Sequence, residues 1–305
     1  MARSALHAIL IALVRGLIGT AIAALMIGLV AAKFGRVPQV GAPGHYKVAP
    51  GIRAHPEDWP ATFIFSTDGS ELCTATAVGA SVVLTAAHCI AGKDGTVGHA
   101  VAAQIWRPDV DGERLAVRCD APAGYRYVEH QVDPDDTALC RLADGAHFSG
   151  FAALSNMPAN LVMQIYAGGS PWYEKLAPAG DQTVARDDEI TLLGYGCTTH
   201  YGSDSSVLSY NKARITTTLR SNVVYIADNS GGGGTVCAGD SGGAAYYGMT
   251  SDGPVRRVFA VNSAFAAADS YLAPVTTPGF VAWAKQWAKG DQICGVTEDA
   301  IGCKP

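Results

Sequence analysis

Residues Cys237–Gly243 read CAGDSGG, which sets one hydroxyl, that of Ser241, between glycines. Such glycines leave room for a substrate and let backbone N–H groups approach the carbonyl that a nucleophile attacks. Two other motifs supply the partners that a serine nucleophile needs: LTAAHC contains His88, and Asp136 opens the stretch DTAL. Together the three motifs predict an acyl-transfer triad of His88, Asp136 and Ser241.

Each member of this triad has its own expected role. A serine hydroxyl must lose its proton as it attacks, so Ser241 needs a neutral imidazole within hydrogen-bond reach. His88 is the best candidate because it follows an apolar, strand-like run and adjoins a cysteine, whereas a lone histidine would more simply be a core residue. Asp136 would fix the imidazole tautomer and stabilise the imidazolium. It directly precedes Thr-Ala-Leu, so we expect it to be carried inward, and Asp133 and Asp135 to be solvated loop acids.

The composition is that of a globular protein of enzyme size. The chain has 305 residues, of which 49% are hydrophobic and 16% charged, so it can bury one or two substantial cores. The net charge is −5 and the lysines and arginines are scattered, so we expect no nucleic-acid partner. No Cys-x-x-Cys pair or Cys/His cluster has zinc spacing, and we expect neither a metal nor another cofactor.

The N-terminal segment, residues 1–32, has a different character. An uncharged run of 17 residues, Gly16–Ala32, is followed by Lys33 and Arg36 and predicts export. Small residues near Ala32 favour cleavage as a signal peptide, but the apolar length also suits a membrane anchor, which needs about 20 residues. We expect a secreted, periplasmic or other extracytoplasmic protein that contacts a membrane only if the segment is retained. Eight cysteines in such a chain favour disulfides.

The remaining sequence predicts an all-β body. Residues 33–47 are read as a linker or propeptide, rich in Pro and Gly. Beyond it, short β-branched and apolar runs separated by turn residues favour a sandwich or barrel over alternating βαβ units. The expected strands are 62–66, 75–85, 101–106, 189–194, 223–227 and 255–261.

One helix is expected near the C-terminus. Thr276 or Thr277 can cap it, and Pro278 suits its first turn. Two tryptophans and other apolar residues follow on one face until Gly290, so this aromatic stripe should pack on the β structure.

The motifs LTAAHC, DTAL and GDSGG, in this chain order, resemble the His, Asp and Ser motifs of the chymotrypsin-like (trypsin-fold) serine endopeptidases. The resemblance covers about residues 48–289, with an Asp-to-Ser spacing somewhat long for the family. It implies two antiparallel six-stranded Greek-key barrels, a site between them and a C-terminal helix. The expected domains are a first barrel half at 48–160, a second half with the helix at 161–290, and a disulfide-linked tail at 291–305.

By the same resemblance, the backbone N–H groups of Gly239 and Ser241 would form the oxyanion hole. Ser263 resembles the strand residue that lines the substrate cleft and supports the catalytic aspartate. Thr235 stands at the base of the primary specificity pocket, where a trypsin would have an aspartate. Without that carboxylate a Lys or Arg side chain would be buried unpaired, so we expect specificity for uncharged side chains, with Phe265 narrowing the entrance.

Disulfide pairing follows from the resemblance as well. In this family a disulfide fixes the loop of the catalytic histidine, and its cysteines correspond to Cys73 and Cys89. The usual partner of Cys237 is missing, and Cys197 is the nearest candidate across the site. The pairs that then remain are Cys119–Cys140 and Cys294–Cys303.

The resemblance also suggests a zymogen activated between Lys47 and Val48. The sequence VAPG from Val48 is similar to the Ile-Val-Gly-Gly start of mature family members. The new ammonium of Val48 would pair with Asp240 and hold the oxyanion hole in shape. In the alternative, Asp240 hydrogen-bonds within a precursor that is already active.

Two other functions compete with that of an exported endopeptidase acting on polypeptides. The GDSGG motif also fits the nucleophile elbow of α/β-hydrolase esterases. That fold needs its histidine after the serine, and the last histidine here is His200, so the order excludes it. The second alternative is a non-catalytic protease homologue that acts as a binding module, although such proteins usually lose a triad member.

Overall fold

The computed structural model describes 14 segments between residues 51 and 297, all of them within the compact unit Val40–Pro305. Four sequence predictions fall outside these segments: the export segment 1–32, the linker 33–47, Val48 and Cys303. The described segments are 51–55, 58–68, 72–108, 114–129, 131–143, 146, 148, 174–177, 184–197, 207–218, 225–228, 235–247, 257–266 and 269–297. No helix among them is long and apolar enough to cross a membrane.

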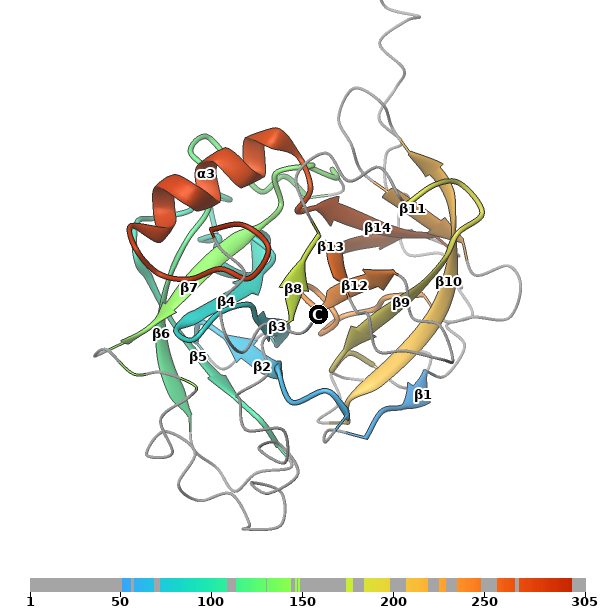
Figure 1. Ribbon diagram of the computed structural model, residues 1–305, viewed down its shortest axis with the longest axis horizontal. Coiled ribbons are helices and arrows are strands. Elements are labelled where there is room, and N and C mark those ends of the chain that lie inside the picture. The colour runs from blue at the N-terminus through green and yellow to red at the C-terminus, as the bar shows by residue number, and fades with distance from the viewer. Residues whose placement is uncertain are drawn as a thin grey trace, which may run out of the picture. The chain divides into compact units, whose positions relative to one another are not determined.

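The first barrel is a closed, antiparallel, six-stranded sheet with the order β2-β3-β4-β7-β6-β5 (Figure 1). The run 75–85, expected as one strand, forms two, because the chain turns between Val78 and Val82, whose N–H and carbonyl groups bond across the turn. The strands are β2 (Thr62–Ser66), β3 (Cys73–Ala77), β4 (Val82–Thr85), β5 (Val101–Trp106), β6 (Leu115–Asp120) and β7 (Ala138–Leu142).

The second barrel repeats this order as β9-β10-β11-β14-β13-β12, closed by pairing of β9 with both β10 and β12. Two short strands extend this sheet: β1 (Ile52–Arg53) pairs with β10, and β8 (Lys175–Leu176) pairs with β13. The barrel strands are β9 (Glu189–Gly194), β10 (Ser209–Thr218), β11 (Tyr225–Asp228), β12 (Ala244–Tyr247), β13 (Arg257–Ala266) and β14 (Asp269–Pro274). The expected all-β fold of two antiparallel six-stranded barrels is therefore confirmed.

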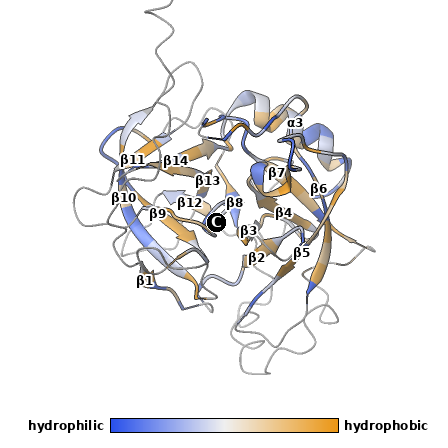
Figure 2. Ribbon diagram, turned by 180° about the vertical axis from the view of Figure 1, so that it is seen from behind, coloured by the Kyte–Doolittle hydropathy of each residue, from blue (hydrophilic) through white to orange (hydrophobic). Residues whose placement is uncertain are grey.

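Burial patterns explain why these sequences form strands. β2 is buried along its whole length, because one face lines a barrel and the other meets packed residues. β5 instead alternates between buried and exposed positions, as expected for a strand with one solvated face. Figure 2 shows a similar contrast in the second barrel, where β9 is hydrophobic and β10 largely hydrophilic. One buried cluster contains Leu84 of the first barrel, Tyr246 of the second and Phe280, so both barrels share part of their core.

The C-terminal helix α3 (Pro278–Ala288) forms as predicted and packs against the first barrel. The hydroxyl of Thr277 caps it by accepting the N–H of Phe280 at 3.1 Å. On its barrel-facing side, the indole Nε1 of Trp287 donates to Asp120 of β6 at 2.9 Å. The guanidinium of Arg141, on β7, lies 3.7 Å from the centre of a Trp287 ring, a cation–π distance. Helix α3 therefore covers part of the first barrel.

Candidate active site

His88 begins a short 3-10 helix, η2 (His88–Ile90), just beyond the buried strand β4. The next residue, Cys89, forms a disulfide with Cys73 of β3 at a Cα–Cα distance of 6.3 Å, which confirms the predicted pairing. A ring nitrogen of His88 and the two sulfurs lie within 4.8 Å of one another. Because these sulfurs are bonded to each other, they are not the free thiolates that a metal would bind.

Asp136 lies beside His88 because β4 and β7 are antiparallel neighbours, with Thr85 opposite Ala138. Its Oδ2 lies 2.7 Å from Nδ1 of His88, and its Oδ1 accepts the backbone N–H of His88 at 2.8 Å. The carboxylate is 3% exposed, as expected from its place at the start of a strand. Of its neighbours, Asp135 is exposed as expected, but Asp133 is half-buried.

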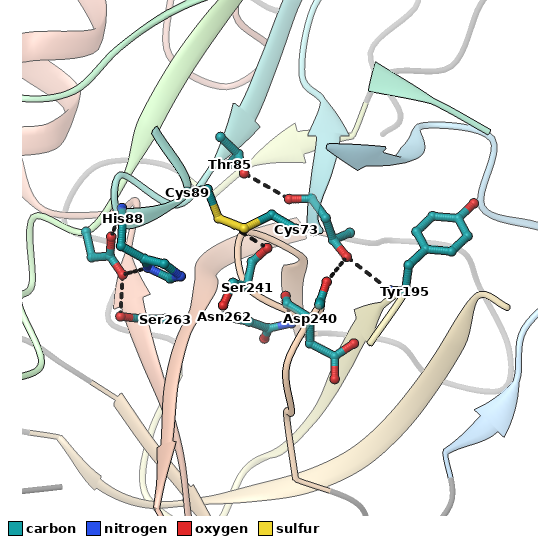
Figure 3. Close-up of a disulfide and its surroundings, with 12 residues drawn as sticks. Cys73, Thr85, His88, Cys89, Tyr195, Asp240, Ser241, Asn262 and Ser263 are labelled. Carbon is teal, nitrogen blue, oxygen red and sulfur yellow. Dashed lines mark hydrogen bonds and ion pairs between the residues drawn. A yellow bond between two sulfur atoms is a disulfide. The ribbon is translucent and has the colours of Figure 1, made fainter. Parts of the chain in front are cut away.

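Two further hydroxyls bind this carboxylate. Ser263, on β13, donates to Oδ2 at 2.6 Å, so the second barrel also supports Asp136 (Figure 3). Tyr125 donates to Oδ1 at 2.9 Å. Tyr125 was not predicted, since a tyrosine in a polar loop carries no local signal of this contact.

These contacts set the protonation of Asp136. Burial alone would raise the pKa of this carboxyl, but the charge of His88 and the hydrogen bonds from His88 and Ser263 outweigh it and hold the pKa below its usual range. The carboxylate is therefore ionised at neutral pH. A charged acceptor opposite Nδ1 favours the tautomer that carries its proton there and leaves Nε2 as the basic nitrogen.

Residues 238–241 form the turn that carries Ser241, the serine turn. This turn is bonded to strand β3 and lies against the disulfide beside His88. The carbonyl of Ser241 accepts the N–H of Thr74, on β3, at 2.8 Å and lies 3.8 Å from Sγ of Cys89. Figure 3 shows Ser241 beside this disulfide, with His88 next to it. A side chain at Gly242 is excluded, because a Cβ there would lie 2.4 Å from the carbonyl oxygen of Thr74. The structure thus joins His88 directly to Asp136 and fastens the turn of Ser241 to the disulfide that adjoins His88.

Two backbone N–H groups in this turn, those of Gly239 and Ser241, donate to no acceptor in the described part of the chain. Their orientation is set by the carbonyls that share their peptide planes, since C=O and N–H point in opposite directions across a trans peptide. The carbonyl of Ala238 accepts the N–H of Cys197 at 3.1 Å, and that of Asp240 accepts the N–H of Gly243 at 2.9 Å. Gly239 itself has a φ of +92°, which favours glycine.

The carboxylate of Asp240 lies against the end of β9. Its Oδ1 accepts the N–H of Gly196 at 2.8 Å, and its Oδ2 accepts the N–H of Cys237 at 3.0 Å. A Cβ at Gly196 would lie 2.4 Å from the carboxyl carbon, so glycine is required there. The predicted partner of this carboxylate, Val48, lies outside the described residues.

The other disulfides agree with the predicted pairs as far as they are described. Cys197 is bonded to Cys237, which ties the end of β9 to the serine turn, and Cys119 to Cys140 across β6 and β7. The pair Cys294–Cys303 stays a prediction.

The predicted specificity residue Thr235 is 3% exposed, and its hydroxyl has no hydrogen-bond partner among the described residues. The next residue, Val236, donates its N–H to the hydroxyl of Ser270, on β14, at 3.0 Å. Phe265, two residues beyond Ser263, is 39% exposed. Thr235 is therefore a buried residue whose own side chain is an uncharged hydroxyl.

Comparison with known proteins agrees with this geometry. No curated protein matches the sequence. A solved structure of a mutant of human heparin binding protein matches with a TM-score of 0.56 and 16% identity, over 79% of this chain and 96% of that one, which shows a shared fold. The family described as Trypsin matches residues 49–277, about three quarters of the sequence. The chain, with its two barrels and its His88, Asp136 and Ser241 motifs, therefore belongs to the trypsin family.

Proposed function

We propose that the protein is a serine endopeptidase in which Ser241 is the nucleophile, His88 the general base and Asp136 the residue that orients the imidazole. The observation that carries this proposal is the 2.7 Å contact of Nδ1 of His88 with a buried, ionised Asp136. This contact places the basic nitrogen of the ring on the side away from Asp136, where a serine proton can be accepted.

The reaction would proceed through an acyl-enzyme. As Oγ of Ser241 attacks the scissile carbonyl, its proton passes to Nε2 of His88, and the carbonyl oxygen becomes an oxyanion. The N–H groups of Gly239 and Ser241 are available to stabilise that charge. His88 then gives its proton to the leaving amine, and a water molecule, activated in the same way, releases the acid and restores Ser241.

The expected substrates are polypeptides with an uncharged side chain before the scissile bond. Thr235 supplies a buried hydroxyl instead of a carboxylate, so a cationic side chain placed beside it would have no counter-charge from this residue. A peptide library should therefore be cleaved after Ala, Val, Leu or Phe in preference to Lys or Arg. Faster cleavage after Arg or Lys would contradict this assignment of Thr235.

Export and zymogen activation between Lys47 and Val48 are part of the proposal. Export is supported by the N-terminal apolar run and the disulfides. Activation would add the ammonium of Val48 to the carboxylate of Asp240, which already accepts two backbone N–H groups. N-terminal sequencing of the active enzyme, together with Lys47→Gln, tests this step. Full activity with the residues before Val48 still attached would show that the precursor is already competent.

A fluorophosphonate probe tests the catalytic proposal. Protein cleaved before Val48 should be labelled on Ser241 and should hydrolyse peptides, and Ser241→Ala should abolish both. Ser209→Ala, on β10 in the second barrel, is a control that should be labelled like the wild type. If activated wild-type protein neither labels nor cleaves any peptide or ester, the protein is instead a non-catalytic homologue that acts as a binding module.

A further inference from the structure

The serine turn is held by all of its carbonyl groups, although it belongs to no helix or strand. The carbonyls of four consecutive residues, 238–241, each accept a hydrogen bond. Gly239 accepts its hydrogen bond from the side chain of Thr74, and Asp240 accepts one from the side chain of Asn262 in addition to that from the N–H of Gly243. The sequence motifs gave neither of these side chains a role.

Thr74 reaches the turn from the first barrel. Its side chain is fully buried on β3, and its hydroxyl donates to the carbonyl of Gly239 at 2.8 Å. The same oxygen accepts the N–H of Tyr195, just beyond β9, at 3.0 Å. Since a hydroxyl has one hydrogen, the acceptance from Tyr195 leaves that hydrogen directed at Gly239.

Asn262 holds the turn from within the second barrel. It is 1% exposed on β13, and its Nδ2 donates to the carbonyls of Asp240 at 3.2 Å and Leu193 at 3.1 Å. The opposite amide orientation would place its oxygen against two carbonyl oxygens, so the donor assignment follows from the surroundings. Its backbone N–H and carbonyl also bond to Gly243 and Gly242, both at 2.8 Å.

We propose that Thr74 and Asn262 are positioning residues for the oxyanion hole, an inference that rests on the proposed function. The amide of Asn262 binds the carbonyl of the peptide whose N–H belongs to Ser241, so it fixes the direction of that N–H. Thr74 binds the next carbonyl toward the N-terminus and limits rotation about Gly239, the glycine with positive φ. Donors that are already oriented need no reorganisation when charge develops on the substrate.

Replacing the two side chains by apolar residues of similar size tests the proposal. We expect Asn262→Leu to lower kcat by on the order of 10-fold to 100-fold, less than the loss of an oxyanion donor itself. Thr74→Val should lower kcat by roughly 10-fold, because it acts one peptide further away. KM should stay within about twofold for both variants, since these contacts serve the transition state.

Matched variants separate positioning from packing. Thr76→Val removes a buried hydroxyl on the same strand as Thr74, one with no partner among the described residues, and should leave kcat unchanged. Thr74→Ser keeps the hydroxyl and should retain most of the activity. The second readout is inhibition by a peptide boronic acid, whose tetrahedral adduct places an oxygen in the oxyanion hole. Its inhibition constant should rise in proportion to the loss of kcat.

The results that would overturn the positioning role differ from those that would overturn the proposed function. If activated wild-type protein is not labelled by the fluorophosphonate, the proposed function fails. If the wild type is active but Asn262→Leu and Thr74→Val keep wild-type kcat and boronate affinity, the positioning role is overturned. It is also overturned if Thr74→Ser loses as much activity as Thr74→Val, or if Thr76→Val loses as much, because the defect would then be one of packing.

Discussion

The first barrel, β2–β7, and the second, β9–β14, have the same strand order but contribute to the site differently. The first supplies side chains: His88 and Asp136 lie at the ends of adjacent antiparallel strands, so the register of β4 and β7 sets their distance. The second supplies mainly backbone, in a glycine-rich turn whose carbonyls are bound and whose N–H groups at Gly239 and Ser241 have no acceptor among the described residues. One fold thus positions functional groups either by strand register or by hydrogen bonds to a loop.

The largest effect on kcat should come from the side chains that the first barrel supplies. Asp136→Asn would keep the shape of the site but turn an acceptor opposite Nδ1 of His88 into an amide that favours the wrong tautomer. We expect kcat to fall by about 10⁴-fold. Peptide hydrolysis by the purified variant measures this. A loss under about tenfold would show that the register of β4 and β7 does not serve catalysis.

A smaller loss of kcat is expected from a change in the backbone turn that the second barrel supplies. Gly239→Ala puts a side chain on a residue with φ of +92°, so the turn must shift to relieve strain. Misdirecting one oxyanion donor should lower kcat by about 10²-fold to 10³-fold. Fluorophosphonate labelling should slow with it, while Gly279→Ala, at the open first turn of α3, serves as the control. Wild-type kcat in Gly239→Ala would remove this turn from the mechanism.

The disulfide Cys119–Cys140 should affect stability but not chemistry. It links β6 to β7 in the first barrel and closes a loop of 21 residues, so replacing both cysteines by alanine should reduce the free energy of unfolding by about 3 kcal/mol. Denaturant unfolding measures this loss. At denaturant concentrations below the unfolding transition, kcat of the variant should equal that of the wild type. A large drop in kcat would mean that the strands holding Asp136 are less rigid than their register implies.

The smallest of these effects depends on pH. Tyr125→Phe removes a hydrogen bond to a charged acceptor and should cost about 2 kcal/mol of stability at pH 7. Because the folded pKa of Asp136 is depressed, the stability that its charged form gives is present above the ordinary value of 3.8 and is lost as the pH falls through the folded pKa. The difference between wild type and variant should therefore narrow in acid. A difference that stays constant from pH 7 to pH 2 would show that Asp136 is not the group responsible.

The motifs predicted the residues whose neighbours in sequence reveal them. His88 and Asp136 each adjoin an apolar strand, Ser241 lies among glycines, and turn residues separated most of the strands that were expected. Thr74, Tyr125 and Asn262 could not be predicted, because their roles depend on contacts distant in sequence. Thr74 is 165 residues from the carbonyl that it binds, and the strand around it reads as an ordinary buried β segment. The single strand expected at 75–85 was wrong for a different reason, since Gly79 and Ser81 are local turn residues inside an apolar run.

Each barrel binds an element that lies far from it in sequence, and this affects folding during synthesis. Strand β1, near the beginning of the described chain, pairs with β10 of the second barrel, whereas α3, near its end, covers Asp120 and Arg141 of the first. During translation the first barrel therefore emerges without its covering helix. Strand β1 has no partner until β10, more than 150 residues later, has been made. Neither barrel can be completed before the ribosome has made residues 269–288, which supply β14 and α3. Nascent chains that stop short of α3 should thus present an apolar surface to chaperones and proteases.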